Sequence, residues 1–168
     1  AALDAVRYKG KTVFVIGGSD GAAKEALYLS KTAEKVVMIV IEKSLSSIPE
    51  FSQRIADTNN IKVYTNSHIS RVSGEKHIEE VEILSSESNK PVIVKAREGG
   101  IFVYAGSTPN TAWCTGIETT NGSIDTAVDM QTNINGVYAI GDIRVKPYRQ
   151  ISTAVADGSL ASIPACPS

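Results

Sequence analysis

A glycine-rich turn between a short apolar run and a helix-like segment constrains the fold of this 168-residue chain more than any other feature. The run Thr12–Ile16 has the β-branched composition of a buried strand, and it stops at Gly17 and Gly18. Residues 21–31 are mostly good helix formers with apolar side chains at helical spacing, and a second apolar run covers residues 36–41. This order predicts a right-handed βαβ unit and a parallel first sheet.

A glycine-rich turn in this position is typical of dinucleotide-binding sites. Small residues let the backbone approach a pyrophosphate, and the free N–H groups and dipole of the following helix attract its charge. The predicted phosphate-binding residues are Gly17, Gly18, Ser19, Asp20, Gly21 and Ala22. Two points stay open. The turn could serve only to connect strand and helix, and Ser19, where glycine is usual, either has a negative φ and offers its hydroxyl or weakens binding.

A carboxylate follows the second predicted strand. Glu42 lies about twenty residues beyond the glycine turn, where it can accept hydrogen bonds from an adenosine ribose and repel a 2′-phosphate. This position favours NADH over NADPH, and we include Glu42 and its neighbour Lys43 among the predicted cofactor-binding residues. Lys35 and Lys43 would partly offset the repulsion, and a charged residue at a strand end is often simply solvated.

The rest of the chain predicts further elements in two lobes. A helix at 50–56 and a strand at 61–64 come first, and short apolar bursts from Ile69 to Val94 then predict an antiparallel meander. Gly99 and Gly100 introduce a strand at 101–105 that stops at Gly106, where we expect a lobe boundary. Short segments at 123–125 and 136–140 precede a helix from about 150 to 163. The expected fold class is α/β, with a Rossmann-like βαβ domain and a meander.

Composition excludes several classes of function. A net charge of −1 is a poor match to nucleic acid or anionic membranes, and the longest apolar run is too short to span a bilayer. His68 and His77 lie in separate polar contexts, so we expect no metal site. Cys114 and Cys166 are far apart and are interpreted as ordinary thiols. Without a recognisable signal peptide, the expected location is the cytoplasm.

Several strings, in the right order along nearly the whole chain, carry a family resemblance. They are Tyr8–Lys11, Val15–Gly18, Glu25–Leu29, Gly100–Val103 through Gly106, Pro109–Thr111, Gly136–Asp142 and Tyr148–Ile151. The chain resembles the C-terminal part of low-molecular-weight thioredoxin reductases, and still more the reductase core of alkyl hydroperoxide reductase flavoprotein subunits.

This resemblance implies an NAD(P)H-binding domain in residues 1–100 and, in residues 101–168, the C-terminal segment of an FAD-binding domain. It places Gly141 and Asp142 at the phosphate and ribityl part of FAD, and Gly106 among the cofactor-binding residues. Arg149, Gln150 and Ile151 would begin a helix whose N-terminus stabilises the anionic reduced flavin. Taken alone, Gly141 and Asp142 would fit an ordinary strand-ending turn.

The sequence also departs from the family pattern. No glycine-rich unit for the FAD adenosine precedes Ala1, so the N-terminal FAD half is expected to be missing, and Leu3 stands at the second position of the redox CxxC. Val40, Ile41 and Glu42 replace the arginine patch that binds the 2′-phosphate of NADPH. No residue of the chain is therefore predicted to be catalytic.

The sequence leaves several functions open. The first hypothesis is part of a flavoenzyme that passes hydride from NAD(P)H, with NADH favoured, to FAD and on to a disulfide or another acceptor. The resemblance implies a homodimer and a thioredoxin- or peroxiredoxin-like acceptor. The alternatives are a non-catalytic dinucleotide-binding module, including a degenerate regulatory protein, and a ferredoxin-NADP reductase of the thioredoxin-reductase-like type.

Overall fold

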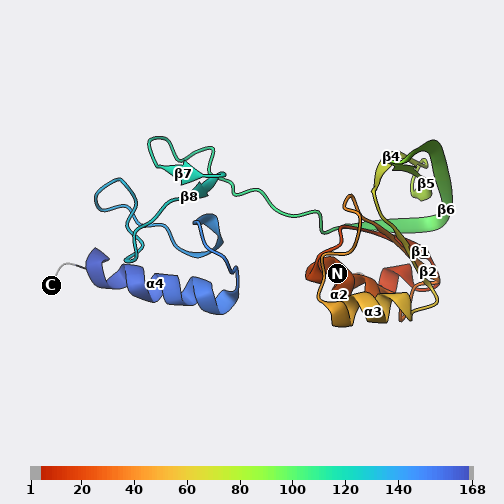
Figure 1. The fold of residues 1–168 in the computed structure, drawn as a ribbon, viewed down its shortest axis with the longest axis horizontal. Coiled ribbons are helices and arrows are strands. Elements are labelled where there is room, and N and C mark those ends of the chain that lie inside the picture. The colour runs from red at the N-terminus through yellow and green to blue at the C-terminus, as the bar shows by residue number, and fades with distance from the viewer. Residues whose placement is uncertain (1–4, 167–168) are drawn as a thin grey trace. The chain divides into compact units, whose positions relative to one another are not determined.

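A computed structural model describes residues 5–166 and divides the chain into two compact units, one ending at Gly106 and the other beginning at Ser107 (Figure 1). The elements of the first unit alternate between strands and helices before a run of strands. They are the 3-10 turn η1 (Val6–Tyr8), β1 (Thr12–Ile16), α2 (Asp20–Leu29), β2 (Lys35–Ile39), α3 (Pro49–Ala56), β3 (Ile61–Tyr64), β4 (Ser67–Ser73), β5 (Ile78–Ser85) and β6 (Ser88–Val103).

The strands of the first unit form one sheet in the order β3-β2-β1-β6-β5-β4. Strands β3, β2 and β1 pair in parallel, and β1 also pairs in parallel with the last part of β6. Strands β4, β5 and β6 pair antiparallel. The α/β fold class, the parallel first sheet and the meander are therefore confirmed.

The core of the first unit lies on both faces of β1 and β2. Val13 and Val15 face a cluster built by α2, with Ile55 of α3 at its edge. Phe14 and Val37 face the other way, toward the apolar residues of the meander. Because both faces are buried, these strands are nearly continuous apolar runs, as is usual for parallel strands.

The strand expected at 101–105 is confirmed as far as Val103, but it is not a separate strand. Gly99 and Gly100 lie inside β6, which continues through them from the meander to the parallel sheet (Figure 1). A Cβ at Gly99 would lie 2.8 Å from the carbonyl oxygen of Thr12, and one at Gly100 would lie 2.5 Å from the Tyr8 ring. Close neighbours, rather than a chain reversal, require these glycines.

The second unit holds little regular structure besides one helix. Its elements are β7 (Thr119–Thr120), β8 (Ser123–Ile124), the 3-10 turn η2 (Gly141–Ile143) and α4 (Ile151–Ala165). The predicted helix is confirmed with nearly the expected bounds. The segment at 136–140 forms no strand and takes part only in an isolated bridge between Gln131 and Tyr138.

The break between the units coincides with the lobe boundary expected at Gly106, whereas the family resemblance implied a domain boundary at residue 100. Ile101, Phe102 and Val103 pair with β1, so they belong to the first unit, which ends at Gly106. Leu3, the residue at the expected cysteine position, lies outside the described residues. None of the helices within residues 5–166 is long and apolar enough to cross a membrane.

Candidate functional sites

The glycine turn follows β1 directly and is shaped by close backbone neighbours. Gly17 has a φ of +122°, and its N–H donates to the carbonyl oxygen of Ile39 at 2.9 Å. A Cβ at Gly17 would lie 2.4 Å from the backbone oxygen of Tyr104, and one at Gly18 would lie 2.8 Å from Cγ1 of Val40. Side chains at these positions would therefore collide with the backbone just after β6 or with the side chain just after β2.

Ser19 is the N-cap of α2 and has a φ of −73°. Its backbone oxygen accepts the first helical bond, from the N–H of Ala23 at 2.9 Å. The φ of Ser19 is therefore negative, as the phosphate-binding alternative requires, and the serine fits the turn without strain. Because the first N–H groups of a helix have no acceptor within it, the turn presents donors in front of α2.

A pocket of about 580 Å³ opens at this turn. It is formed where β1, β2 and β6 end and where β4 begins, which is the carboxyl edge of the parallel strands. Its lining residues are Ile16, Gly17, Gly18, Ser19, Ile39, Ile41, Glu42, Ser46, Ser67, His68, Ile69, Tyr104, Ala105 and Gly106. We call this the glycine-turn pocket.

The glycine-turn pocket brings together Gly17, Gly18, Ser19, Glu42 and Gly106 of the predicted site residues. The other predicted residues of this region do not line it. Asp20 instead accepts a hydrogen bond from the N–H of Ile48 at 2.8 Å, Gly21 is exposed at the start of α2, Ala22 is fully buried, and Lys43 is exposed.

Sequence reasoning missed the residues contributed by β4 and by the end of β6. Tyr104 and Ala105 follow a strand that is parallel to β1, so their place at the same edge could have been deduced once β6 was assigned to the first sheet. For Ser67, His68 and Ile69, no motif in the sequence points to the pocket.

Two backbone tethers fix the segments that frame the pocket. The N–H of Ser46 donates to the carbonyl oxygen of Gly18 at 2.9 Å, which holds the segment after β2 against the glycine turn. Asn66 donates its N–H to the carbonyl oxygen of Glu42 at 2.9 Å, and its own carbonyl accepts from Ser86 at 2.7 Å. The side chain of Asn66 donates to the Glu87 carboxylate at 2.8 Å. The turn between β5 and β6 thereby supports the backbone of Glu42.

The titratable side chains that line the pocket are Glu42, His68 and Tyr104. Its lining, all of which lies in the described part of the chain, includes Glu42 but no lysine or arginine. Tyr104 donates its hydroxyl to Oε2 of Glu25 at 2.9 Å. Burial, the hydrogen bond to Glu25 and the Glu25 charge raise the pKa of Tyr104 above its usual value. Tyr104 is therefore a neutral donor at neutral pH.

A second pocket, of about 520 Å³, lies within the second unit. It is lined by Ser107, Thr108, Pro109, Asn110, Asn121, Ser123, Asp142, Ile143 and Arg149. Of the predicted residues, Asp142 and Arg149 line this second-unit pocket, and Nε of Arg149 donates to the carbonyl oxygen of Asp142 at 3.3 Å. Gln150 and Ile151 are exposed and do not line it.

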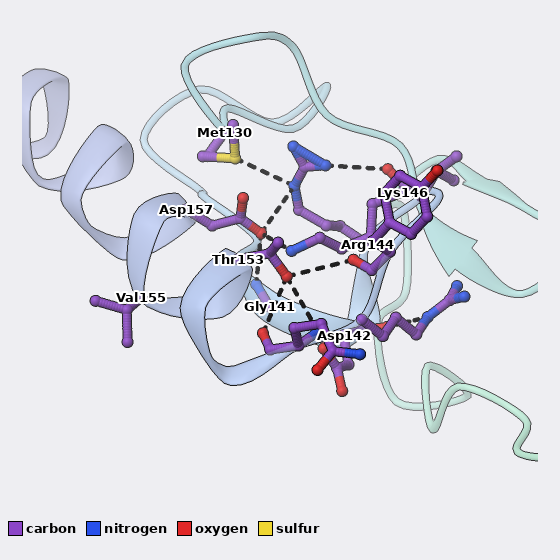
Figure 2. Close-up of polar contacts among 12 residues, drawn as sticks. Met130, Gly141, Asp142, Arg144, Lys146, Thr153, Val155 and Asp157 are labelled. Carbon is purple, nitrogen blue, oxygen red and sulfur yellow. Dashed lines mark hydrogen bonds and ion pairs between the residues drawn. The ribbon is translucent and has the colours of Figure 1, made fainter. Parts of the chain in front are cut away.

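Gly141 precedes the pocket residue Asp142, is buried and has a φ of +77°. Its N–H donates to Oδ2 of Asp157 at 3.0 Å (Figure 2). The same oxygen lies 2.6 Å from Nζ of Lys146 and 3.3 Å from Nε of Arg144. Burial raises the pKa of Asp157, but the hydrogen bonds from Lys146 and Gly141 and the two positive charges outweigh it and bring the pKa below its usual value.

Comparisons with known proteins agree with this arrangement. The sequence pattern of the pyridine nucleotide-disulphide oxidoreductase family matches residues 2–158. The chain belongs to this family. Thioredoxin reductase from Borreliella burgdorferi is 34% identical over 165 residues, which is 97% of this chain and 50% of the relative. A 34.2 kDa protein in the rubredoxin operon of Clostridium pasteurianum is 33% identical, with 95% and 52% covered.

Solved structures show the same similarity to this oxidoreductase family. Lactococcus lactis thioredoxin reductase, in its FR conformation, has a TM-score of 0.87 at 33% identity, and the match covers 98% of this chain and 55% of that one. The chain thus spans about half the length of the relatives it matches. In the described part of this family member, Cys114 and Cys166 are both free.

Proposed function

We propose that the chain is part of a flavin-dependent NAD(P)H oxidoreductase of thioredoxin reductase type. The single observation that carries this proposal is the glycine-turn pocket, in which a strand end, a helix N-terminus and a carboxylate meet at the carboxyl edge of a parallel sheet. Dinucleotides bind at such edges in open α/β sheets. The whole protein would transfer hydride from NAD(P)H to FAD and then pass electrons to a disulfide or another acceptor.

The residues of the glycine-turn pocket fit a dinucleotide by their donor set. The N–H groups in front of α2 and the hydroxyl of Ser19 would hold the pyrophosphate. The Glu42 carboxylate would accept the ribose hydroxyls, and Ile41 and Ile69 supply apolar surface for the adenine. Asp20 does not fit a direct contact, because its carboxylate is engaged with Ile48 and would repel phosphate.

We infer that NADH is preferred over NADPH. A 2′-phosphate would enter a pocket whose charged lining residue is Glu42, and the exposed Lys43 lies outside that lining. Repulsion at close range between two anions disfavours the phosphorylated coenzyme, and the described lining of the pocket holds no lysine or arginine to offset it.

The second-unit pocket fits part of FAD. Asn110, Asn121 and the Ser107 and Thr108 hydroxyls are hydrogen-bond donors, Arg149 supplies a positive charge for phosphate, and Asp142 can accept from ribityl hydroxyls. FAD, when bound, supplies the redox chemistry. This chain's residues would orient it, with the N-terminus of α4 favouring negative charge nearby. The roles of Gly106, Gln150 and Ile151 in cofactor binding stay predictions.

The proposed acceptor is a thioredoxin- or peroxiredoxin-like protein, because several relatives carry the name thioredoxin reductase. We also propose a homodimer for the whole protein. Sedimentation of the purified protein tests the dimer, and reduction of insulin disulfides by NADH in the presence of thioredoxin tests the acceptor.

Optical titration tests the core of the proposal. The purified protein should bind FAD with a flavin absorption band, and NADH should bleach this band under anaerobic conditions. NADH should also quench protein fluorescence in a saturable manner. A colourless protein that still binds NADH would favour the non-catalytic module. A protein that binds neither ligand would refute both the enzyme and the module.

Charge reversal at Glu42 tests the coenzyme preference. Glu42→Arg should raise the affinity for NADPH relative to NADH by about tenfold, equivalent to about 1.4 kcal/mol. Glu75→Arg makes the same charge change at an exposed site outside the pocket, and its coenzyme preference should equal that of the wild type. Equal responses of the two variants would refute the assigned role of Glu42.

A further inference from the structure

Asp157 is a buried carboxylate that the proposed dinucleotide and flavin contacts leave without a role. The residue is 7% exposed, and it lies on α4 behind the turn that follows Ile140. Oδ2 of Asp157 meets the backbone N–H of Gly141, Nζ of Lys146 and Nε of Arg144 (Figure 2). We call these four residues the Asp157 cluster.

The Asp157 cluster connects α4 to the wall of the second-unit pocket. Gly141 is held against α4, since a Cβ at this residue would lie 3.6 Å from the Cβ of Ala154. The next residue, Asp142, lines the pocket, and its carbonyl oxygen accepts from Arg149, which also lines it. The hydrogen bond between Gly141 and Asp157 therefore lies one residue away from a pocket residue.

Stability alone does not account for this arrangement. Buried ion pairs of this kind are often no more stable than apolar residues of similar volume. A packed leucine could hold α4 against the loop, but it could not accept the N–H of Gly141 and so fix the direction of the backbone. A directed bond to one amide is a means of positioning.

We propose that Asp157 is a positioning residue for the second-unit pocket: by accepting the Gly141 N–H it sets the backbone of residues 141–142 and hence the direction of the Asp142 carboxylate. Arg144 and Lys146 hold Asp157 in place. Because two cations meet one carboxylate, the cluster has a net positive charge, and it adjoins in the chain a residue of a pocket that would receive an anionic ligand. The flavin part of this inference rests on the proposed function, whereas the positioning of the turn does not.

Hydrogen exchange of the Gly141 amide, followed by NMR in the full chain, tests the positioning directly. Asp157→Ala removes the acceptor, Asp157→Asn keeps an acceptor without the charge, and Lys146→Met removes one cation but leaves the Gly141 bond. Exchange at Gly141 should be at least tenfold faster in Asp157→Ala than in wild type, with Asp157→Asn intermediate and Lys146→Met close to wild type. Amides of β1 and β2 should not change in any variant.

Fluorescence titration with FAD supplies the second measurement. The dissociation constant for FAD should rise about tenfold in Asp157→Ala and less in Asp157→Asn, while that for NADH should stay constant because its pocket lies in the other unit. Amides of α4 report whether the second unit of each variant is folded. A folded Asp157→Ala with wild-type Gly141 exchange, or with wild-type FAD affinity, would overturn the inference.

The remaining outcomes are also decisive. If Asp157→Ala does not fold, Asp157→Asn decides the test. Wild-type exchange at the Gly141 amide together with wild-type FAD affinity in this variant would overturn the inference, because the weaker acceptor would then have no effect on the turn. If the wild type does not bind FAD, the proposed function fails for this chain, and the Gly141 exchange rates decide the positioning role by themselves.

Discussion

Steric limits, more than chemistry, decide which residue types the glycine turn can hold. Gly17 is required because its φ is +122° and the Tyr104 carbonyl occupies the space of a side chain. Ser19 is tolerated because its φ lies in the region open to all residues. The GGxxGA spacing of residues 17–22 predicted the need for glycine at position 17. It could not reveal Asp20 turned toward Ile48, because that contact depends on the path of a loop almost thirty residues later.

Gly17→Ala should lower the free energy of unfolding by about 2–3 kcal/mol, because the new side chain is strained in φ and collides with the Tyr104 backbone. Urea denaturation followed by circular dichroism measures the change. Gly10→Ala is a matched control, with a φ of +68° but open space around the position, and it should cost only about 1 kcal/mol. Equal losses in both variants would contradict the steric account.

Asp157 should make the second unit sensitive to acid. Because the pKa of Asp157 is lowered in the folded protein, its contribution to stability is present above the unfolded value of about 3.9 and is lost as pH falls through the folded pKa. Urea unfolding of wild type and Asp157→Asn between pH 7 and pH 2.5 measures this. The difference between the two stabilities should shrink below about pH 4, whereas parallel curves would contradict the assignment.

At the scale of elements, periodicity identified the strands and helices of the first unit but not their full extent. The βαβ unit, α3 and the meander were predictable, because their apolar spacing agrees with burial in the fold. Helix α4 of the second unit was also predicted, although most of its large apolar residues are exposed. The path of β6 was not predictable. Glycines that relieve crowding against Tyr8 and Thr12 look the same in the sequence as glycines that reverse the chain. As a result, the pocket residues Tyr104 and Ala105 were missed.

Gly158 lies in the middle of α4, where glycine lowers the stability of a helix. No close neighbour requires a glycine at this position. A Cβ there would only touch Cδ1 of Ile140, at an ordinary 3.7 Å. Gly158→Ala should therefore stabilise the second unit by about 0.5–1 kcal/mol through helix propensity. Thermal unfolding measures the gain. The control is Ala156→Gly, at an exposed position of the same helix, which should lower the stability by a similar amount. If Gly158→Ala is destabilised instead, the glycine is needed for packing.

At the scale of the whole molecule, the two units differ in how much apolar surface they bury. Both core clusters lie in the first unit, whereas the buried apolar residues within residues 107–166 of the second are Ile124, Met130, Ala139 and Ala161. Helix α4 exposes Ile151, Val155, Leu160 and Ile163. Since burial of apolar surface is the main stabilising contribution, the units should have different stabilities.

Unfolding should begin in the second unit. Hydrogen exchange followed by mass spectrometry at increasing urea should show residues 107–166 exchanging before residues 12–103. Limited proteolysis under native conditions should likewise cut the second unit first. Adding FAD should delay both processes if the second-unit pocket binds it, and NADH is the control ligand for the first unit. Simultaneous exchange of the two units would contradict the unequal cores.

Asn66 has a consequence for engineering the coenzyme preference. One asparagine holds the backbone of Glu42 and receives support from Ser86 and Glu87 at the tip of the hairpin between β5 and β6. The backbone that carries the discriminating carboxylate is thus supported from outside the cavity. Selectivity could be retuned by redesigning that solvent-facing hairpin tip, with every ligand-contacting side chain left as it is.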